Sequence, residues 1–554
     1  MTAGISSCLP SLALATAILL AGCGGGSSSS TPTPMPPPAA GPLPDPPVRV
    51  STLSPFAANC DGANVTANLN VNAEVEPSVA VNPRDPNNLV GVWQQDRWGD
   101  GSARGIVSGA SFDGGATWQQ RAMPFSACAG GTFLRVTDPW ITMAPDGVAY
   151  QNALASSGGS FQPGSRNAVL ASRSTDGGRT WSAPATLITD GQAFFNDKNS
   201  ITADATDARY VYAVWDRLAQ DGSGPTYLAR SVDRGLTWEP ARPIYDAGPF
   251  NQTINNQVVV LPNGTLIGFF TQLDAASNPG TPSSVGIVRS TDKGLNWSPR
   301  IKIADVGSVG TTAPETGVRV RDGTNLGSIA VSPAGVLHAV WQDARATAGL
   351  RDNILLSSSS DGGLTWSGPL RINADPTVAA FTPTVAVRTD GTIGVTYYDF
   401  RSNTADPRTL PTDYWLIRSI DGITWRESRV SGPFDLAIAP NANGLFLGDY
   451  QSLASIGNVF VPFFAQTSDN DLNNRTDVYA VVARNASVSA AVGVPAKRVV
   501  EAARAVTEYR AEAAPPLVVT AELRQALDGN VVQMMERRVP GWSMRRGKGQ
   551  PPGR

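Results

Sequence analysis

Acidic and arginine side chains recur after apolar runs that end in an aromatic residue. Runs ending at Trp93, Trp215, Trp341 and Tyr398 are followed by the pairs Asp96 and Arg97, Asp216 and Arg217, Asp343 and Arg345, and Asp399 and Arg401. Arginine can hold a carboxylate through two parallel hydrogen bonds, and a crowded aspartate can have a raised pKa. The pattern therefore predicts either a site for an anionic ligand or an ion pair that the fold repeats.

The composition excludes several other kinds of chemistry. The 554 residues carry a formal net charge of -3, so we expect no nucleic-acid partner. The chain has one histidine, His338, and its segment Gly-Val-Leu-His-Ala-Val-Trp has the alternation of a strand, which indicates a structural residue. A single histidine excludes a multi-histidine zinc or iron site, and we expect neither a metal nor another cofactor.

Short strands joined by a repeated turn must position the pairs. The 55 glycines and 43 prolines disfavour long helices. A pattern close to Ser-x-Asp-x-Gly-x-Thr-Trp starts at Ser111, Ser174, Ser231, Ser290 and Ser359, and a copy one residue shorter starts at Ser419. Each copy is typical of a hairpin turn in which the aspartate accepts backbone hydrogen bonds, a glycine takes a positive φ, and the tryptophan packs under the next strand.

Further strands repeat in register with these turns. Each turn follows an apolar run ending in an aromatic residue, and a seventh run, ending at Phe464, has no such turn after it. The last set of strands therefore lacks a fourth strand, whereas the segment near Val50 has no set of its own. Pairing the two removes an open sheet edge, which favours a ring of seven sets, with six as the alternative.

The repeated turn resembles the Asp-box, also called the bacterial neuraminidase (BNR) repeat. This resemblance implies an all-β, sialidase-like β-propeller over residues 48–484, with each Asp-box between the third and fourth strands of a blade. It also implies that the box aspartates are structural, because the boxes lie on the face opposite the ligand-binding loops.

The resemblance further implies a set of site residues. Sialidases bind an anionic sugar with arginines, activate a tyrosine nucleophile with a glutamate, and use an aspartate as acid/base. Gly-Asp-Tyr-Gln-Ser-Leu-Ala-Ser resembles the nucleophile segment and points to Tyr450, with Asp96 as acid/base and Glu315 as the partner glutamate. The implied substrate-binding residues are Arg97, Arg217, Arg345 and Arg401.

The sequence departs from the family at two points. Val75 stands where the first arginine belongs, and Asn255, Asn256 and Gln257 stand where a glutamate is expected. Two classes of function therefore stay open. One is a sialidase-like glycosidase that removes a terminal anionic sugar, and the other is a non-catalytic propeller that binds glycans or proteins, or serves as an envelope scaffold.

The N-terminal region predicts export and anchoring. Residues 1–23 resemble a bacterial lipoprotein signal that ends in Leu20-Ala21-Gly22-Cys23, which makes Cys23 the expected lipidation site, with a plain cleaved signal peptide as the alternative. Residues 24–47 are rich in Gly, Ser, Thr and Pro, as in a tether. We therefore expect a protein of the bacterial cell envelope, anchored to a membrane through lipid and facing the periplasm or the exterior.

Two further predictions concern the body and the C-terminus. In an oxidising compartment Cys60 and Cys128 can form a disulfide, with free buried thiols as the alternative. Residues 485–554 have helical spacing followed by a basic tail, which predicts a short helical extension.

Overall fold

The computed structural model describes residues 46–62, 68–274, 280–468, 470–481 and 507–543. These residues belong to one compact unit, Leu43–Arg554. The other unit, Met1–Pro42, lies outside the described residues, and so do Cys23 and nearly all of the predicted tether. The described chain is mostly β, which confirms the predicted fold class at that level.

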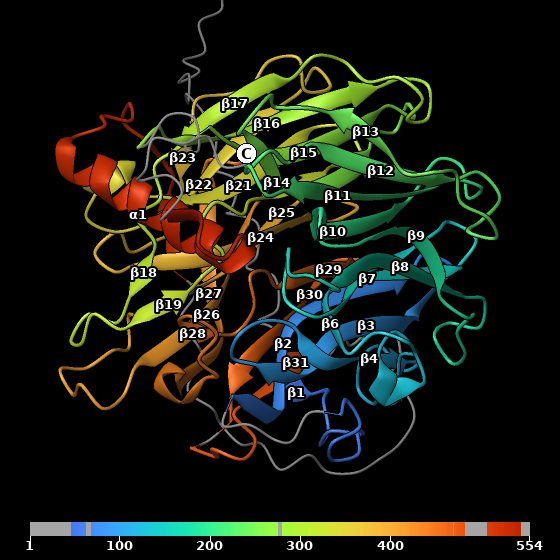
Figure 1. Ribbon diagram of the computed structural model, residues 1–554. Coiled ribbons are helices and arrows are strands. Elements are labelled where there is room, and N and C mark those ends of the chain that lie inside the picture. The colour runs from blue at the N-terminus through green and yellow to red at the C-terminus, as the bar shows by residue number, and fades with distance from the viewer. Residues whose placement is uncertain (1–45, 63–67, 275–279, 469, 482–506, 544–554) are drawn as a thin grey trace, which may run out of the picture. The chain divides into compact units, whose positions relative to one another are not determined.

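Most strands form units of four consecutive antiparallel strands (Figure 1). In chain order these are β2–β5 (Leu69–Asn82, Asp85–Trp98, Ala103–Ser111, Gln119–Ala122), β6–β9 (Arg135–Met143, Ala149–Ser157, Arg166–Ser174, Ala185–Asp190), β10–β13 (Phe194–Ala203, Val211–Ala219, Thr226–Ser231, Arg242–Tyr245), β14–β17 (Gln252–Val260, Leu266–Leu273, Ser283–Ser290, Ile301–Val306), β20–β23 (Ser328–Val331, Leu337–Asp343, Asn353–Ser359, Leu370–Arg371) and β24–β27 (Ala380–Val387, Ile393–Asp399, Pro411–Ser419, Thr424–Asp435).

A further unit brings together the two ends of the sheet region. Its strands are β29 (Ser452–Ile456), β30 (Val459–Thr467), β31 (Thr476–Ala480) and β1 (Val48–Arg49). Val48 lies opposite Ala480 in an antiparallel pair. This is the pairing that the strand count predicts for the segment near Val50.

The first strands of the units lie side by side. β2 contacts β6, and the contacts continue through β10, β14, β20 and β24 to β29, which in turn contacts β2. In Figure 1 the blue strands β2 and β3 accordingly lie next to the orange-red strands β29 to β31. Apolar side chains fill the space between neighbouring units, and the tryptophans Trp93, Trp215 and Trp341 are fully buried there.

The repeated turns join the third and fourth strands of their units. In the turn after β4, the Ser111 hydroxyl donates to Asp113 over 2.8 Å, and the Gly115 amide donates to Ser111 Oγ over 2.9 Å. The Thr117 amide donates to Asp113 over 2.9 Å. The same serine–aspartate bond recurs in the other copies, so these aspartates serve the turn.

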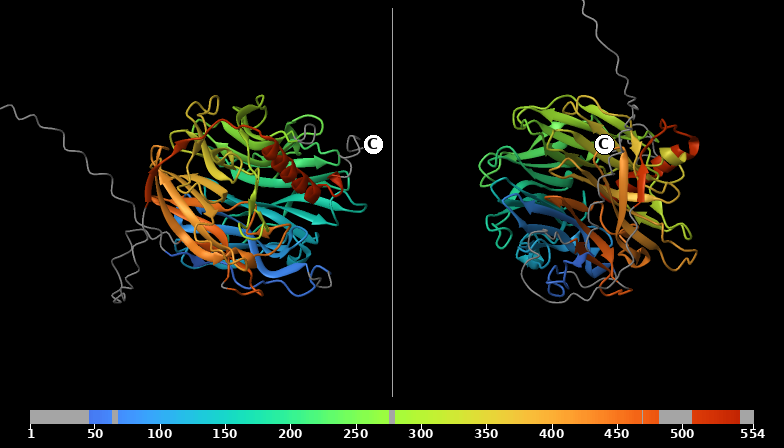
Figure 2. Two further views of the ribbon diagram at one scale, coloured as in Figure 1. Left: turned by 90° about the vertical axis from the view of Figure 1, so that its left-hand side faces the viewer. Right: turned by 180° about the vertical axis from the view of Figure 1, so that it is seen from behind.

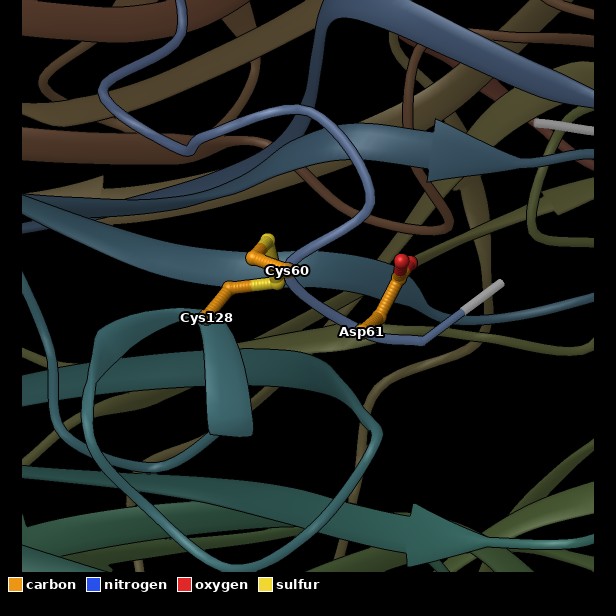
Figure 3. A group of neighbouring side chains, drawn as sticks. All are labelled: Cys60, Asp61 and Cys128. Atoms are coloured by element: carbon orange, nitrogen blue, oxygen red, sulfur yellow. A yellow bond between two sulfur atoms is a disulfide. The ribbon is translucent and has the colours of Figure 1, made fainter. Parts of the chain in front are cut away.

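A disulfide ties the segment before β2 to the 3₁₀ turn η1 (Ala127–Ala129). Cys60 and Cys128 are bonded to each other, with their Cα atoms 4.9 Å apart (Figure 3). Among the described residues, the one group of potential metal ligands that lies close together is Cys60, Asp61 and Cys128. Because both sulfurs are used in the disulfide, this group does not offer a metal site.

The C-terminal region is only partly helical. Residues 507–514, which the sequence predicts as helix, instead contain β32 (Thr507–Arg510) and β33 (Glu512–Ala513), which pair with the outer strands β27 and β23. The backbone groups of these residues bond to the free edges of the two sheets, instead of to one another as they would in a helix. The predicted helix is present as α1 (Ala521–Arg538), which begins after its N-cap Thr520.

The remaining elements are short. β18 (Thr311–Thr312), β19 (Arg319–Arg321) and β28 (Leu445–Phe446) form a small separate sheet, and η2 (Arg345–Thr347) and η3 (Leu436–Ile438) are 3₁₀ turns. In all three views α1, drawn in red, lies outside the sheets (Figure 2). Across the residues with described structure, no helix combines the length and apolar character needed to cross a bilayer.

Candidate functional site

Three of the predicted arginines are held in ion pairs with aspartates of the sheets. Arg217 pairs with Asp190 at 2.6 Å, and Arg345 pairs with Asp343 at 2.9 Å. Arg401 pairs with Asp399 at 2.6 Å and also with Glu427. The predicted convergence of these arginines on one ligand is therefore not what the contacts show. The repeated ion pair, the alternative left open by the sequence, is present at Asp343–Arg345 and Asp399–Arg401, whereas Arg217 pairs with Asp190 of the preceding unit.

Asp96 and Glu315 also lie away from a common site. Asp96 is fully buried and accepts hydrogen bonds from the Ser54 hydroxyl at 2.7 Å and the Asn72 amide at 2.9 Å. Glu315 is exposed and accepts a hydrogen bond from Asn403 at 2.7 Å. Neither carboxylate has a contact with Tyr450, so the predicted catalytic trio is not assembled in this structure.

Charged residues do converge where the first strands of several units are bulged. Glu76 in β2, Asp138 in β6 and Lys198 in β10 have φ angles of 54°, 53° and 50°, in the left-handed region. Each lies at a break in strand register. A non-glycine residue in this conformation costs about 1 kcal/mol or more, and bulges redirect side chains. The bulges turn these three side chains toward one cluster.

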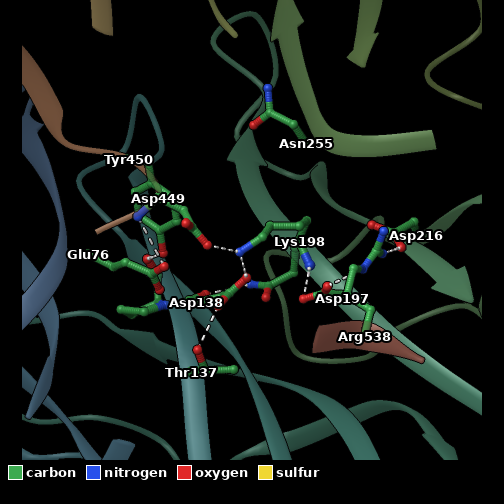
Figure 4. Close-up of polar contacts among 12 residues, drawn as sticks. Glu76, Thr137, Asp138, Asp197, Lys198, Asp216, Asn255, Asp449, Tyr450 and Arg538 are labelled. Atoms are coloured by element: carbon green, nitrogen blue, oxygen red, sulfur yellow. Dashed lines mark hydrogen bonds and ion pairs between the residues drawn. The ribbon is translucent and has the colours of Figure 1, made fainter. Parts of the chain in front are cut away.

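Lys198 and Arg321 connect this cluster to the loop before β29. The Lys198 ammonium lies 3.2 Å from Asp138 Oδ2 and 2.7 Å from Asp449 Oδ2. Arg321, at the end of β19, binds Asp449 with both Nε, at 2.9 Å, and Nη2, at 2.5 Å. The amide of Asp449 donates to Glu76 Oε1 over 3.3 Å. Figure 4 shows these acids gathered on one side of Lys198.

Arg97 is the one predicted substrate-binding arginine that adjoins the cluster. Its Nη1 donates to Gln94 Oε1 over 2.8 Å, and Gln94 in turn donates to Glu76. The guanidinium groups of Arg97 and Arg321 both lie over the Phe446 ring, at 4.8 and 4.3 Å from its centroid. Arg97 Nε has no hydrogen-bond partner among the described residues, so this buried arginine has unused donor capacity.

Burial and charge push two carboxyl groups of the cluster in opposite directions. Burial, together with the charge of Asp138, raises the pKa of Glu76 to about 8. Burial alone would also raise the pKa of Asp449, but Arg321 and Lys198 hold it well below its usual range. One carboxyl can therefore carry a proton at neutral pH beside another that is ionised. This arrangement suits acid–base chemistry.

Tyr450 adjoins the cluster but lacks the contacts of an activated nucleophile. Its hydroxyl donates to the carbonyl oxygen of Pro139 over 2.9 Å, and its ring packs against Trp140. Burial and the nearby charge of Glu76 raise its pKa well above the usual range. Among the described residues, no base is hydrogen-bonded to this hydroxyl, whereas a tyrosine nucleophile requires a base to remove its proton.

The single histidine has a structural setting. His338 Nδ1 lies 2.8 Å from the Ser358 hydroxyl on the neighbouring strand, and burial lowers the pKa of the imidazole to about 4. It therefore stays neutral at physiological pH.

A sequence signal for the cluster existed in the first strands. Glu76 and Asp138 each precede a proline, and Thr382 precedes Pro383 at a similar register break in β24. The repeated residue before proline marks the bulge. Which of these side chains meet across the units depends on contacts distant in sequence, such as Lys198 with Asp449.

Comparisons with known proteins show likeness to glycosidases at low identity. No family model matches the chain. A xyloglucanase from Paenibacillus sp is 27% identical over 328 residues, which cover 53% of this chain and 29% of that protein. The chain thus spans less than a third of the length of this curated relative.

Solved structures similar to the chain include two glycosidases. A Hadza microbial sialidase matches with a TM-score of 0.41 and 20% identity, over 59% of this chain and 63% of that one. An α-L-arabinofuranosidase from Fusarium graminearum matches with a TM-score of 0.40 and 13% identity, over 64% of this chain and 93% of that one.

Proposed function

We propose that the chain is a glycan-acting hydrolase whose reaction centre is the cluster around Glu76, Asp449 and Lys198. The observation that carries the proposal is the meeting of these residues from separate units, with one protonated and one ionised carboxyl. Glycosidases commonly use two such carboxyl groups, one to protonate the leaving oxygen and one to assist the sugar carbon. The named relatives, a xyloglucanase, a sialidase and an arabinofuranosidase, agree with a carbohydrate substrate.

In this proposal Glu76 is the proton donor and Asp449 is the ionised partner. A carboxyl group with a pKa of about 8 keeps its proton at neutral pH and gives it up only to a developing alkoxide. Asp449, held ionised by Arg321 and Lys198, stabilises the positive charge that develops on the sugar ring. Arg97 supplies a free donor for an anionic substituent, which keeps a terminal anionic sugar among the proposed substrates.

Glu76→Gln tests the assignment, with Glu74→Gln as a matched control. Glu74 lies on the same strand, is equally buried, and accepts a hydrogen bond from Gln95 as Glu76 does from Gln94. Sugar release would be measured on xyloglucan, arabinan and sialosides. We expect Glu76→Gln to lower turnover by about 10²-fold or more, and Glu74→Gln to leave turnover per folded molecule unchanged. Equal effects of the two changes would contradict the assignment.

We also propose the architecture and location that the sequence predicts. The contacts between successive first strands, with β29 next to β2, support a seven-bladed propeller. The Leu20-Ala21-Gly22-Cys23 segment supports lipid anchoring in a bacterial envelope. An envelope protein partner belongs to the same proposal.

A binding module is the second candidate, and one observation favours it. The cavity beside Lys198, Arg321 and Asp449 measures about 30 Å³ and is also lined by Asn530 and Met534 of α1. Ligand pockets usually have ~300–1,000 Å³, so this cavity holds roughly one water molecule. A face that already binds a helix is compatible with recognition of a protein rather than a sugar.

A further inference from the structure

The C-terminal helix α1 is seated over the cluster by a mixed face. Its buried residues recur with helical spacing and are Leu523, Leu527, Asn530, Val531, Met534, Met535 and Arg538. Of these, Val531, Met534 and Met535 pack with Leu218, Ile254 and Leu273 near the ends of β11, β14 and β15. Two of the buried positions, Asn530 and Arg538, are polar. Helices that belong permanently to a core usually bury an apolar stripe, so these two positions need a specific explanation.

Arg538 enters a pocket made by Asp197, Asp216 and Gln252. Its Nε lies 2.7 Å from Asp197 Oδ2, and its two terminal nitrogens contact Asp216 and Gln252. The Asp216 side chain is 0% exposed and that of Arg538 is 6% exposed. Three planar donors meeting two carboxylates and an amide oxygen match the shape of a guanidinium group.

This pocket directly adjoins the cluster. Asp197 precedes Lys198 in β10, and the Lys198 amide donates to the Asp197 carboxylate over 3.0 Å. Figure 4 shows Arg538 and Asp216 on the opposite side of Lys198 from Asp449. Anchoring α1 at Arg538 therefore holds Asn530 and Met534 over the small cavity beside Asp449. A sugar cannot enter that cavity while α1 is seated, because the space left is close to that of one water.

The chain before α1 is fixed to the sheets independently of it. β32 and β33 add to the edges of β27 and β23, and the Tyr509 hydroxyl donates to the Ile372 carbonyl oxygen over 2.6 Å. α1 can therefore leave its seat while its N-terminal connection stays in place and the four-stranded units keep all their strands.

We propose that Asp197, Asp216 and Gln252 form a guanidinium-binding pocket, and that α1, anchored there by Arg538, is a displaceable cover over the cavity beside Lys198, Arg321 and Asp449. The opening of the cover rests on the structure of α1 alone. Its effect on turnover rests on the proposed function. A guanidinium group from another polypeptide has the chemistry to compete with Arg538 for the pocket.

Thiol labelling in the full chain tests the cover without any assumption about activity. Thr324, which lines the small cavity, is replaced by cysteine, and the rate of maleimide attachment at position 324 is followed by peptide mass spectrometry. We expect Arg538→Met to raise this rate about ten-fold or more, because the anchor of α1 is lost. Arg524→Met is the matched control, since Arg524 is an exposed arginine on the same helix, and it should leave the rate unchanged.

Two further measurements keep the result interpretable. Asp216→Asn removes the charge from the pocket side and should also speed labelling, while hydrogen exchange in β2 to β31 shows whether the sheets stay folded. Equal labelling rates in the parent, Arg538→Met and Asp216→Asn proteins overturn the proposal, and so does faster labelling accompanied by unfolding of the sheets. Sugar release is then compared. Faster labelling with higher turnover supports both proposals, whereas faster labelling without turnover in any variant retains the cover and rejects the hydrolase.

Discussion

Replacing Arg401 distinguishes a structural ion pair from a ligand-binding arginine. Loss of a structural pair should lower the free energy of unfolding strongly, whereas loss of a ligand contact should not. Its Nε lies 2.6 Å from Asp399 and its Nη2 donates to Glu427 over 2.9 Å, while its guanidinium stacks 3.5 Å from the Trp415 centroid. The side chains of Asp399 and Glu427 are 1% and 2% exposed. Arg401→Ala leaves two buried carboxylates without their cation, which typically costs about 3–5 kcal/mol.

The control for this change is Arg408→Ala. Arg408 pairs with Asp406 at 2.7 Å with the same spacing along the chain, but the two side chains are 85% and 36% exposed. An exposed pair of this kind is screened by water and salt, so we expect no measurable change in unfolding. The two variants remove the same charge and differ in burial.

The loss of stability caused by Arg401→Ala should become larger as pH rises. Burial already raises the pKa of Asp399 to about 7, and Arg401 opposes this shift. A carboxyl group whose pKa is higher in the folded state than in the unfolded state makes its full contribution to stability at pH values below the unfolded pKa. For Asp399 that contribution is lost as pH rises toward about 7. Without Arg401 the folded-state pKa rises further, so the difference from the parent is larger at pH 8 than at pH 5.

Urea unfolding at these two pH values, with sugar release per folded molecule, measures the effect. We expect a lower unfolding midpoint for Arg401→Ala with little change in turnover by the folded fraction. Unchanged unfolding together with lost turnover would refute the structural interpretation and return Arg401 to the ligand site.

Three other predictions follow from the remaining features. If Glu76 donates the proton, kcat/KM should fall as pH rises past about 8, and Glu76→Gln should remove that limb; a limb retained in the variant assigns it to another group. Deleting residues 48–56 should expose the edge of β31 and cause aggregation by light scattering, unlike deletion of residues 30–40. Cys23→Ser should move the protein from the membrane to the soluble fraction, and unchanged fractionation would exclude the lipid anchor.

Much of the fold follows from short-range patterns. The serine–aspartate turn at Ser111 and its copies fix where third strands end, since each turn is stabilised by bonds among neighbouring residues. The unmatched segment near Val50 could be paired with the last strands because a missing fourth strand leaves an open edge. The strand at Thr507–Arg510 was not predictable in this way, because its partner β27 is set by tertiary structure and its own composition is helical.

The candidate site was less predictable from the sequence than the fold. Asp96 and Asp399 have the residue types of a reaction centre, but Asp96 accepts hydrogen bonds from Ser54 and Asn72, and Asp399 pairs with Arg401. The cluster that forms joins Lys198 to Asp449 across 251 residues, and Arg321 to Asp449 across 128. Such contacts depend on which bulges face one another. No local spacing contains that information.

The pairing of β1 with β31 has a consequence for biosynthesis. The Ser51 hydroxyl donates to Asp477 across 426 residues, so one sheet contains both an early and a late part of the chain. A ribosome releases Val48 long before Ala480 exists, and β1 must wait without a partner during that interval. The sheet that joins β1 to β31 is therefore among the last parts of the fold to close.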